Sequence, residues 1–380
     1  MVVHDSPDHG ADVADAAPVR GAPIDVRAYA GLAAILVGLW LAAGALSGAA
    51  HQQRHRRSTQ LGAEGSIALE QGRHGEAAYL LRQAVALEPD DPALRLTLGK
   101  ALAGLDRPQE ALPYVKDVLA ADPVNGEANL VLARLLRRTG DDDGAEAAYY
   151  RAIYGRWRSG QQGLRVQPRL ELVSLFRDAG RRERLRAALL ELSGAFPGDR
   201  ALQLQAGREL LEAGFADDAA RLLRTLVERF ADPGAGVSLL AEAEFARGHL
   251  IDAYAAAGRA LARDPGDRAA ARLHRLSARI LSLDPDQPRI SSSARRDRIR
   301  HLLIEARSRL VACAPPSATA ASPTILPAVD RWVTRRSADV EVGRALLAAA
   351  ASSVAQQCPA PAKDDAAGLL LQQLGAGLAS

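Results

Sequence analysis

Aromatic residues are scarce in this chain. They make up 4% of its 380 residues, and the 48% of hydrophobic residues are mainly Ala and Leu. Sheets favour aromatic and β-branched residues, whereas Ala and Leu favour helices. The composition therefore argues against a sheet-rich fold and predicts an all-α protein, long enough to bury a core.

Catalytic motifs are also missing. The sequence has no GxxxxGK phosphate loop, GxSxG elbow, HExxH pair or CxxC pair, the patterns that place phosphate, nucleophile or metal chemistry at fixed spacing. We therefore expect no enzyme, no cofactor and no metal site. The formal net charge of +3 is too small and too dispersed for a nucleic-acid footprint, so we expect no nucleic-acid partner.

The N-terminal segment combines a polar tail with an apolar stretch. Residues 1–27 are rich in Asp, Ala, Pro and Gly, which predicts a disordered tail, and residues 28–50 contain no charge. A helix over 28–50 measures about 34 Å, enough to cross a hydrocarbon core of about 30 Å. We predict a transmembrane helix, with a cleaved signal peptide ending at the small residues 48–50 as the alternative. Gly44 and Gly48 would let two such helices approach closely, giving a homo-oligomer.

Two cues to membrane orientation disagree. Three arginines follow the apolar stretch and two precede it, so the positive-inside rule favours a cytoplasmic main domain by one residue. A short tail, one anchor and a long following domain, together with two cysteines, favour an exported domain. We expect a single-pass protein of a bacterial inner membrane with its main domain in the periplasm; the cytoplasmic side stays open.

Residues 58–267 repeat with a period of 34. Two columns hold small residues in all passes but the fourth, a third holds turn residues, and Pro recurs near the end of several passes. After a six-residue slip at 155–167 the period resumes, giving six passes. The members of the small columns are Gly65, Gly99, Ala133, Val173, Gly207, Ala241 and Ala77, Ala111, Ala145, Leu185, Ala219, Ala253; those of the turn column are Gly72, Asp106, Gly140, Gly180, Gly214 and Gly248.

Each pass predicts a pair of helices joined by a turn. Apolar residues recur at helical spacing on both sides of the turn, and small residues let the two helices approach. The 34-residue period with these columns resembles the tetratricopeptide repeat family. The resemblance implies a right-handed solenoid of about six repeats, a capping helix at 268–283, and a concave surface that binds peptides or proteins.

The slip contains an unusual concentration of aromatic residues. Either the insertion is a plain surface loop or its aromatic residues contact a partner, with Tyr149 expected in the core. The residues concerned are Tyr149, Tyr150, Tyr154 and Trp157.

The resemblance also implies which residues line the binding groove. The first helix of each repeat would present a cationic strip, which suits an acidic segment or a free C-terminal carboxylate. The alternative is a solvated arginine face paired with Glu or Asp. The groove residues are Lys100, Arg134, Arg137, Arg138, Arg177 and Arg208.

Residues 284–380 predict a smaller helical region with a proline-rich linker at 314–328. Its helix near 293–313 has an arginine-rich face that we expect to be solvated. Cys313 and Cys358, the only cysteines, each close a predicted helix. They could form a disulfide, which would indicate an oxidising compartment, or stay reduced within helix packing.

These patterns lead to one favoured function. The chain is expected to be a membrane-anchored scaffold or adaptor that binds peptide or protein partners. The alternative is an accessory subunit of an envelope enzyme or biogenesis system whose C-terminal region carries the specific activity.

Overall fold

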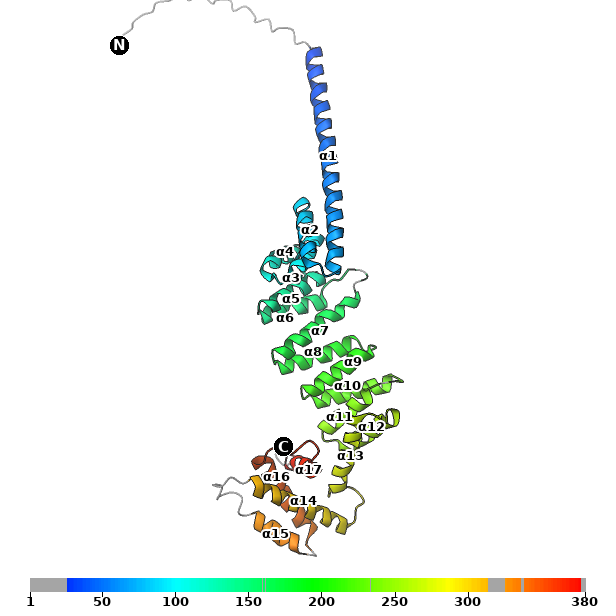
Figure 1. Cartoon of the computed structure of the whole chain (residues 1–380), viewed down its shortest axis with the longest axis vertical. Coiled ribbons are helices and arrows are strands. Elements are labelled where there is room, and N and C mark those ends of the chain that lie inside the picture. Colours follow the sequence, from blue (N-terminus) through cyan, green and yellow to red (C-terminus); the bar gives the residue numbers. More distant parts are fainter. Residues whose placement is uncertain are drawn as a thin grey trace, which may run out of the picture. The chain divides into compact units, whose positions relative to one another are not determined.

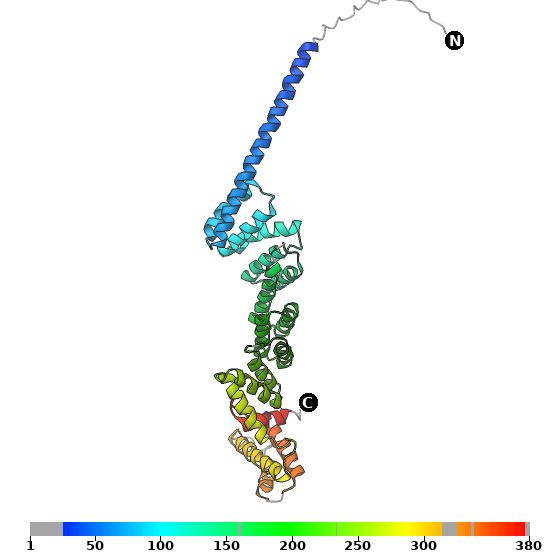
Figure 2. The same cartoon turned by 90° about the vertical axis from the view of Figure 1, so that its right-hand side faces the viewer.

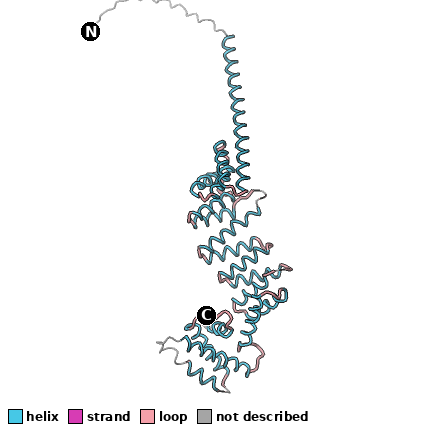
Figure 3. The backbone as a smooth tube through the Cα atoms, viewed as in Figure 1, coloured by secondary structure: helices cyan, strands magenta, loops and turns pink. Residues whose placement is uncertain are grey.

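The computed structural model describes residues 26–158, 160, 162–232, 234–313, 325–335 and 338–376, with side chains of 26–36 and 162 excepted. Seventeen α-helices, a short 3-10 helix and no strand occur in these ranges (Figure 3). The all-α prediction is confirmed. Nearly all of the predicted tail at 1–27 and most of the predicted linker at 314–328 lie outside the described residues. The chain divides into two units, 1–148 and 149–380, which are described separately.

The first unit contains helix pairs. Its helices are α1 (Val26–Glu70), α2 (His74–Leu87), α3 (Pro92–Gly104), α4 (Pro108–Ala121) and α5 (Gly126–Arg138); α6 (Asp142–Tyr154) begins there and ends in the second unit. Figure 2 shows α1 as one unbroken helix that runs into the first repeat. Where side chains are described, no helix has an apolar run long enough to cross a membrane.

The turn column explains where the helices end. All six of its residues have positive φ, from 58° at Asp106 to 85° at Gly214, a conformation that glycine adopts without steric cost. At the first turn the Gly72 amide donates to Leu69 O and the Arg73 amide to Ala68 O. This is the helix-ending pattern expected at a left-handed residue, so the turn column marks real helix ends.

The small columns explain how the paired helices touch. A Cβ added to Gly65 would lie 2.7 Å from Leu81 Cγ, and one added to Gly99 would lie 2.8 Å from Val115 Cγ2. Leu81 and Val115 are fully buried. In these two pairs the second helix therefore packs into space that a side chain on the first would fill.

The second unit continues the pairs after the slip. The 3-10 helix Gln162–Arg165 precedes α7 (Val166–Asp178), α8 (Arg182–Ala195), α9 (Arg200–Glu212), α10 (Ala216–Arg229), α11 (Gly236–Ala246), α12 (Leu250–Arg263) and α13 (Arg268–Leu283) (Figure 1). Tyr149 is 1% exposed, as the core prediction requires, and the Trp157 ring nitrogen donates to Ala152 O at 2.9 Å. Tyr154 is 71% exposed but donates to Glu191 at 2.9 Å.

Four more helices complete this unit. They are α14 (Ser292–Cys313), α15 (Leu326–Thr334), α16 (Val340–Gln357) and α17 (Ala366–Ala376). The start of α15 falls inside the range predicted as linker. One core joins Leu302 of α14 and Leu371 of α17 to Leu250 of α12 and Ile280 of α13, so these helices cover the end of the repeats. A disulfide links Cys313 to Cys358, with their Cα atoms 5.3 Å apart.

Candidate functional site

The first helices of successive pairs stack in the second unit. Contacts join α9 to α11 and α11 to α13, and Figure 1 shows α7, α9 and α11 following one another along the unit. Each of these helices, and α13, carries charged residues. We define the first-helix face as Arg177 of α7, Arg208 and Glu209 of α9, Glu242 of α11 and Arg272 of α13. It contains two of the six residues predicted to bind a partner.

The other four predicted residues lie in the first unit, where each has an internal interaction. Lys100 of α3 is ion-paired with Glu127 of α5. Arg138 donates to Ala103 O and lies 4.0 Å from Asp106. Arg134 and Arg137 also interact with other groups. These four cations therefore already interact with groups of the protein itself. A binding role for them stays a prediction.

The first-helix face carries alternating charge. Arg177 of α7 donates to Glu209 of α9 at 2.8 Å, and Arg208 of α9 and Arg272 of α13 both act electrostatically on Glu242 of α11. The face therefore carries charges of both signs, and the binding role of its arginines stays a prediction. Glu209 and Glu242 were not among the predicted groove residues, because the resemblance implied a cationic strip and the alternative of arginines paired with Glu or Asp named no individual acid.

Glu242 is the unusual member of this face. Burial raises the pKa of its carboxyl group, and Asp267 adds to the increase, while Arg272 and Arg208 oppose it. Within the part of the chain that the structure describes, Glu242 has no hydrogen bond and no ion pair within 4 Å. It occupies the column of Lys100, Arg134, Ser174 and Arg208, so the sign of the charge changes along one repeat position.

Two buried carboxylates hold neighbouring pairs together elsewhere. The Asp218 side chain is 3% exposed and accepts from Arg186 of α8 and Arg221 of α10. The hydrogen bond from Arg186 holds the pKa of Asp218 below its usual value. Glu244, also 3% exposed, pairs with Arg224 of α10 and Arg247. Both fit a structural role, since a carboxylate this buried needs such partners.

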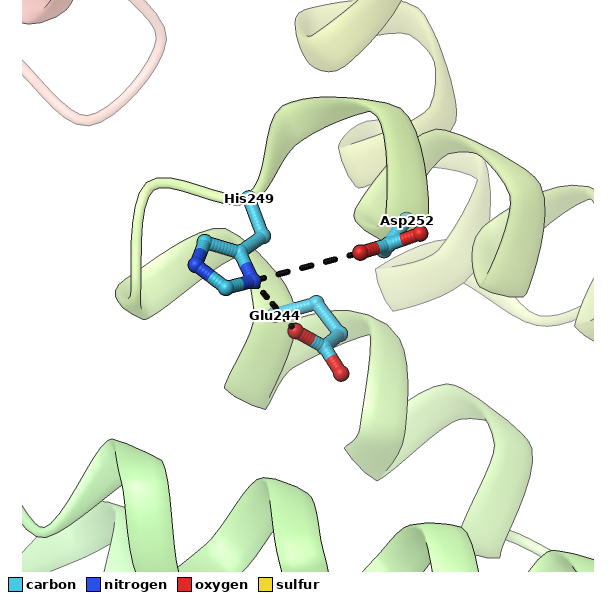
Figure 4. A group of neighbouring side chains, drawn as sticks. All are labelled: Glu244, His249 and Asp252. Atoms are coloured by element: carbon cyan, nitrogen blue, oxygen red, sulfur yellow. Dashed lines mark ion pairs between the residues drawn. The ribbon is translucent and has the colours of Figure 1, made fainter.

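Glu244, His249 and Asp252 bring three metal-ligating groups together (Figure 4). His249 Nδ1 lies 3.4 Å from Glu244 Oε2 and 3.9 Å from Asp252 Oδ2. The Glu244 oxygens are already engaged by the guanidinium groups of Arg224 and Arg247. Two adjacent cations oppose the binding of a third, so this donor set fits an ion cluster at the turn better than a metal site.

The arginine-rich face of α14 differs from its prediction. Arg298 donates to Asp284 O at 2.6 Å and to Leu281 O at 3.4 Å, at the end of α13. Arg300 donates to Val333 O and Arg335 O at the end of α15, each at 3.2 Å. The expectation of a solvated face was wrong for these residues, because they bind carbonyl groups that the helix ends leave without partners.

A cleft of about 610 Å³ lies among α12, the 284–286 turn, α16 and α17. Leu250, Leu347 and Leu370 contribute apolar surface, and the ion-paired Asp286 and Arg344 are among its polar residues. Its volume and apolar lining are typical of a ligand pocket. This cleft is a feature of the C-terminal helices that could carry a separate binding activity.

Several solved structures are distantly similar to this chain. A tetratricopeptide-repeat protein fragment of Cytophaga hutchinsonii is 12% identical, covers 80% of this chain and 98% of its own, and has a TM-score of 0.40. Pseudomonas aeruginosa pilF is 12% identical, with 59% and 99% coverage and a TM-score of 0.39. PilW, described as a type IV pilus biogenesis factor, is 16% identical, with 56% and 96% coverage and a TM-score of 0.36. No curated protein matches the chain.

Family comparison bears directly on the repeats. Residues 96–160 and 204–268 match one tetratricopeptide repeat model, and residues 68–111 match another. Repeats of this kind generally mediate protein–protein interactions. Residues 68–160 and 204–268 are therefore similar to tetratricopeptide repeats, in agreement with the period, the turn column and the helix pairs.

Proposed function

We propose that this protein is a non-catalytic scaffold that holds a protein or peptide partner against the first-helix face. The observation that carries the proposal is the stack of α9, α11 and α13, which presents charged side chains of both signs on successive helices. Such a surface offers hydrogen-bonding and ionic contacts at regular intervals, which suits an extended chain better than a small molecule.

We also propose that α1 anchors the scaffold in a bacterial inner membrane, with the repeats in the periplasm. The uncharged stretch at 28–50 supports the anchor. Leu39, Trp40 and Leu46 of α1 are 62%, 74% and 73% exposed, which also supports the anchor. Exposed apolar surface of this kind is typical of a segment that contacts a membrane or a protein partner. The Cys313–Cys358 disulfide supports an oxidising compartment.

Site-specific photo-crosslinking tests the scaffold. A photoreactive amino acid replaces Arg208 on the first-helix face in one variant and Arg259 on the exposed side of α12 in a matched control. We expect discrete adducts with a partner from Arg208 and none from Arg259 in the cells that make the protein. Equal labelling at both positions, or none at Arg208, would contradict the proposal.

The cleft of about 610 Å³ favours a second candidate, an accessory subunit that acts through its C-terminal helices. Deleting residues 284–380 would be a poor test, because that region shares a core with Leu250 and Ile280. Ala348→Phe is better, since Ala348 lines the cleft and is half-buried, while neighbouring Ala349 is exposed and provides the control. Loss of a partner in Ala348→Phe alone would favour this second candidate.

A further inference from the structure

The first-helix face ends in three charges of alternating sign on three stacked helices. Arg208 lies on α9, Glu242 on α11 and Arg272 on α13, and both arginines attract Glu242. The row is therefore positive, negative, positive along the direction in which the helices stack.

These three groups have unused binding capacity. Arg208 is exposed and, within the described part of the chain, makes no ion pair. Glu242 is half-buried and makes no hydrogen bond to any residue that the structure describes. Arg272 is exposed and lies 3.4 Å from Asp364, whose side chain is 75% exposed. A partly buried carboxylate without a donor is costly, and a cationic group from a partner would relieve that cost.

The spacing of the helices sets the spacing in a partner. Packed helices lie about 8–10 Å apart, whereas a polyproline II segment rises about 3.1 Å per residue and repeats its side-chain direction every third residue. One turn of such a segment, about 9 Å, therefore matches one step between helices. Every third side chain would meet a new helix of the stack.

We propose that this end of the face binds an extended segment with the pattern acid-x-x-base-x-x-acid, which rests on the proposed scaffold function and specifies its partner. The acidic side chains meet Arg208 and Arg272, and the Lys or Arg between them meets Glu242. A uniformly acidic segment is disfavoured, because its central carboxylate would lie against Glu242. The partner is thus defined by alternating charge rather than by net negative charge.

Three synthetic heptapeptides test the pattern in fluorescence anisotropy with the full chain. They are Glu-Pro-Ala-Arg-Pro-Ala-Glu, its rearrangement Arg-Pro-Ala-Glu-Pro-Ala-Glu, and the all-acidic Glu-Pro-Ala-Glu-Pro-Ala-Glu. We expect the first to bind about tenfold more tightly than either of the others, and the preference to fall at high salt. Equal binding of the three, tightest binding of the all-acidic peptide, or no binding would overturn the proposal.

An inverted variant separates recognition from folding. Arg208→Glu, Glu242→Arg and Arg272→Glu together keep the attraction of the two outer groups for the central one but reverse each sign, at the loss of the ion pair between Arg272 and Asp364. This variant should bind Arg-Pro-Ala-Glu-Pro-Ala-Arg more tightly than Glu-Pro-Ala-Arg-Pro-Ala-Glu. If it still preferred the second peptide, the assignment of these three residues as the binding groups would be refuted. If the variant does not fold, Glu242→Gln replaces it and should reduce the preference for the patterned peptide over the all-acidic one. Crosslinking at Arg208 without the peptide preference would leave the scaffold standing and remove only this inference.

Discussion

The close approach of α9 and α10 predicts an energetic coupling between Gly207 and Leu223. A Cβ added to Gly207 would lie 2.7 Å from Leu223 Cδ2 and 2.9 Å from its Cγ. Leu223 is fully buried. One repeat later the corresponding residues are Ala241 and Ala257, both fully buried. The side-chain volume at the two positions is therefore divided differently in successive repeats. A glycine faces a leucine in one pair, and two alanines face each other in the next.

The magnitudes follow from packing. Leu223→Ala leaves a cavity and should lower the free energy of unfolding by about 3 kcal/mol. Gly207→Ala forces overlap worth about 2 kcal/mol, offset by about 1 kcal/mol of helix propensity. In the double variant the new methyl group enters the space vacated by Leu223. We expect a total loss of about 2 kcal/mol instead of the additive value of about 4 kcal/mol.

Urea denaturation of the four proteins in this mutant cycle measures the coupling. Gly194→Ala in α8 is the matched control, because a Cβ there meets nothing within 4 Å. Gly194→Ala should raise the free energy of unfolding through helix propensity alone, because its new methyl group overlaps no neighbour. A coupling energy within about 0.5 kcal/mol of zero would mean that the sites are independent, and would refute the argument that glycine is required by the neighbouring leucine.

Three further predictions concern polar and covalent links. Asp218→Asn should lower the free energy of unfolding by about 2 kcal/mol at neutral pH. Because the pKa of Asp218 is lowered in the fold, the stabilisation by its carboxylate is present above the unfolded pKa and is lost as pH falls through the folded pKa. The urea midpoints of wild type and variant should therefore converge in acid. Arg298→Lys should lower unfolding free energy by about 1–2 kcal/mol, whereas exposed Arg275→Lys should leave the same measurement unchanged. Replacing Cys313 and Cys358 together by Ser should lower the free energy of unfolding by up to about 4 kcal/mol for a loop of this length. Relative to wild type, amide exchange in the variant should become faster in α14 and α16 and change less in α8.

The repeats were predictable because their determinants are local. A left-handed turn residue such as Gly140, with φ of 80°, and a small residue such as Gly99 against Val115 recur at fixed spacing, so each repeat supplies independent evidence of the same unit. The shared core between Leu250 and Leu371 has no such signal. It joins segments far apart in sequence that belong to no common period, and only the folded chain shows that the C-terminal helices pack on the last repeat.

The arginines of α14 illustrate a second limit of sequence reasoning. Helical spacing places Arg298 one turn before Leu302 and Arg300 one turn before Leu303, beside these fully buried residues and not opposite them. Spacing does not reveal that Arg298 and Arg300 donate to carbonyl groups at the ends of α13 and α15. A carbonyl acceptor exists at every residue and leaves no mark in the sequence. An arginine face can therefore be part of the packing while its pattern suggests solvent.

Charge on the first helices of the pairs has to be considered across repeats instead of along each helix. Lys100 pairs with Glu127, 27 residues later, and Arg177 with Glu209, 32 residues later. These separations bring residues of neighbouring helices together, where like charges about 8–10 Å apart would repel. Alternating signs turn that repulsion into attraction between repeats. On the first-helix face, Glu242 has no hydrogen-bonding partner within the described residues. The alternation would therefore make this face selective for the order of charges in a ligand and not merely for their sum.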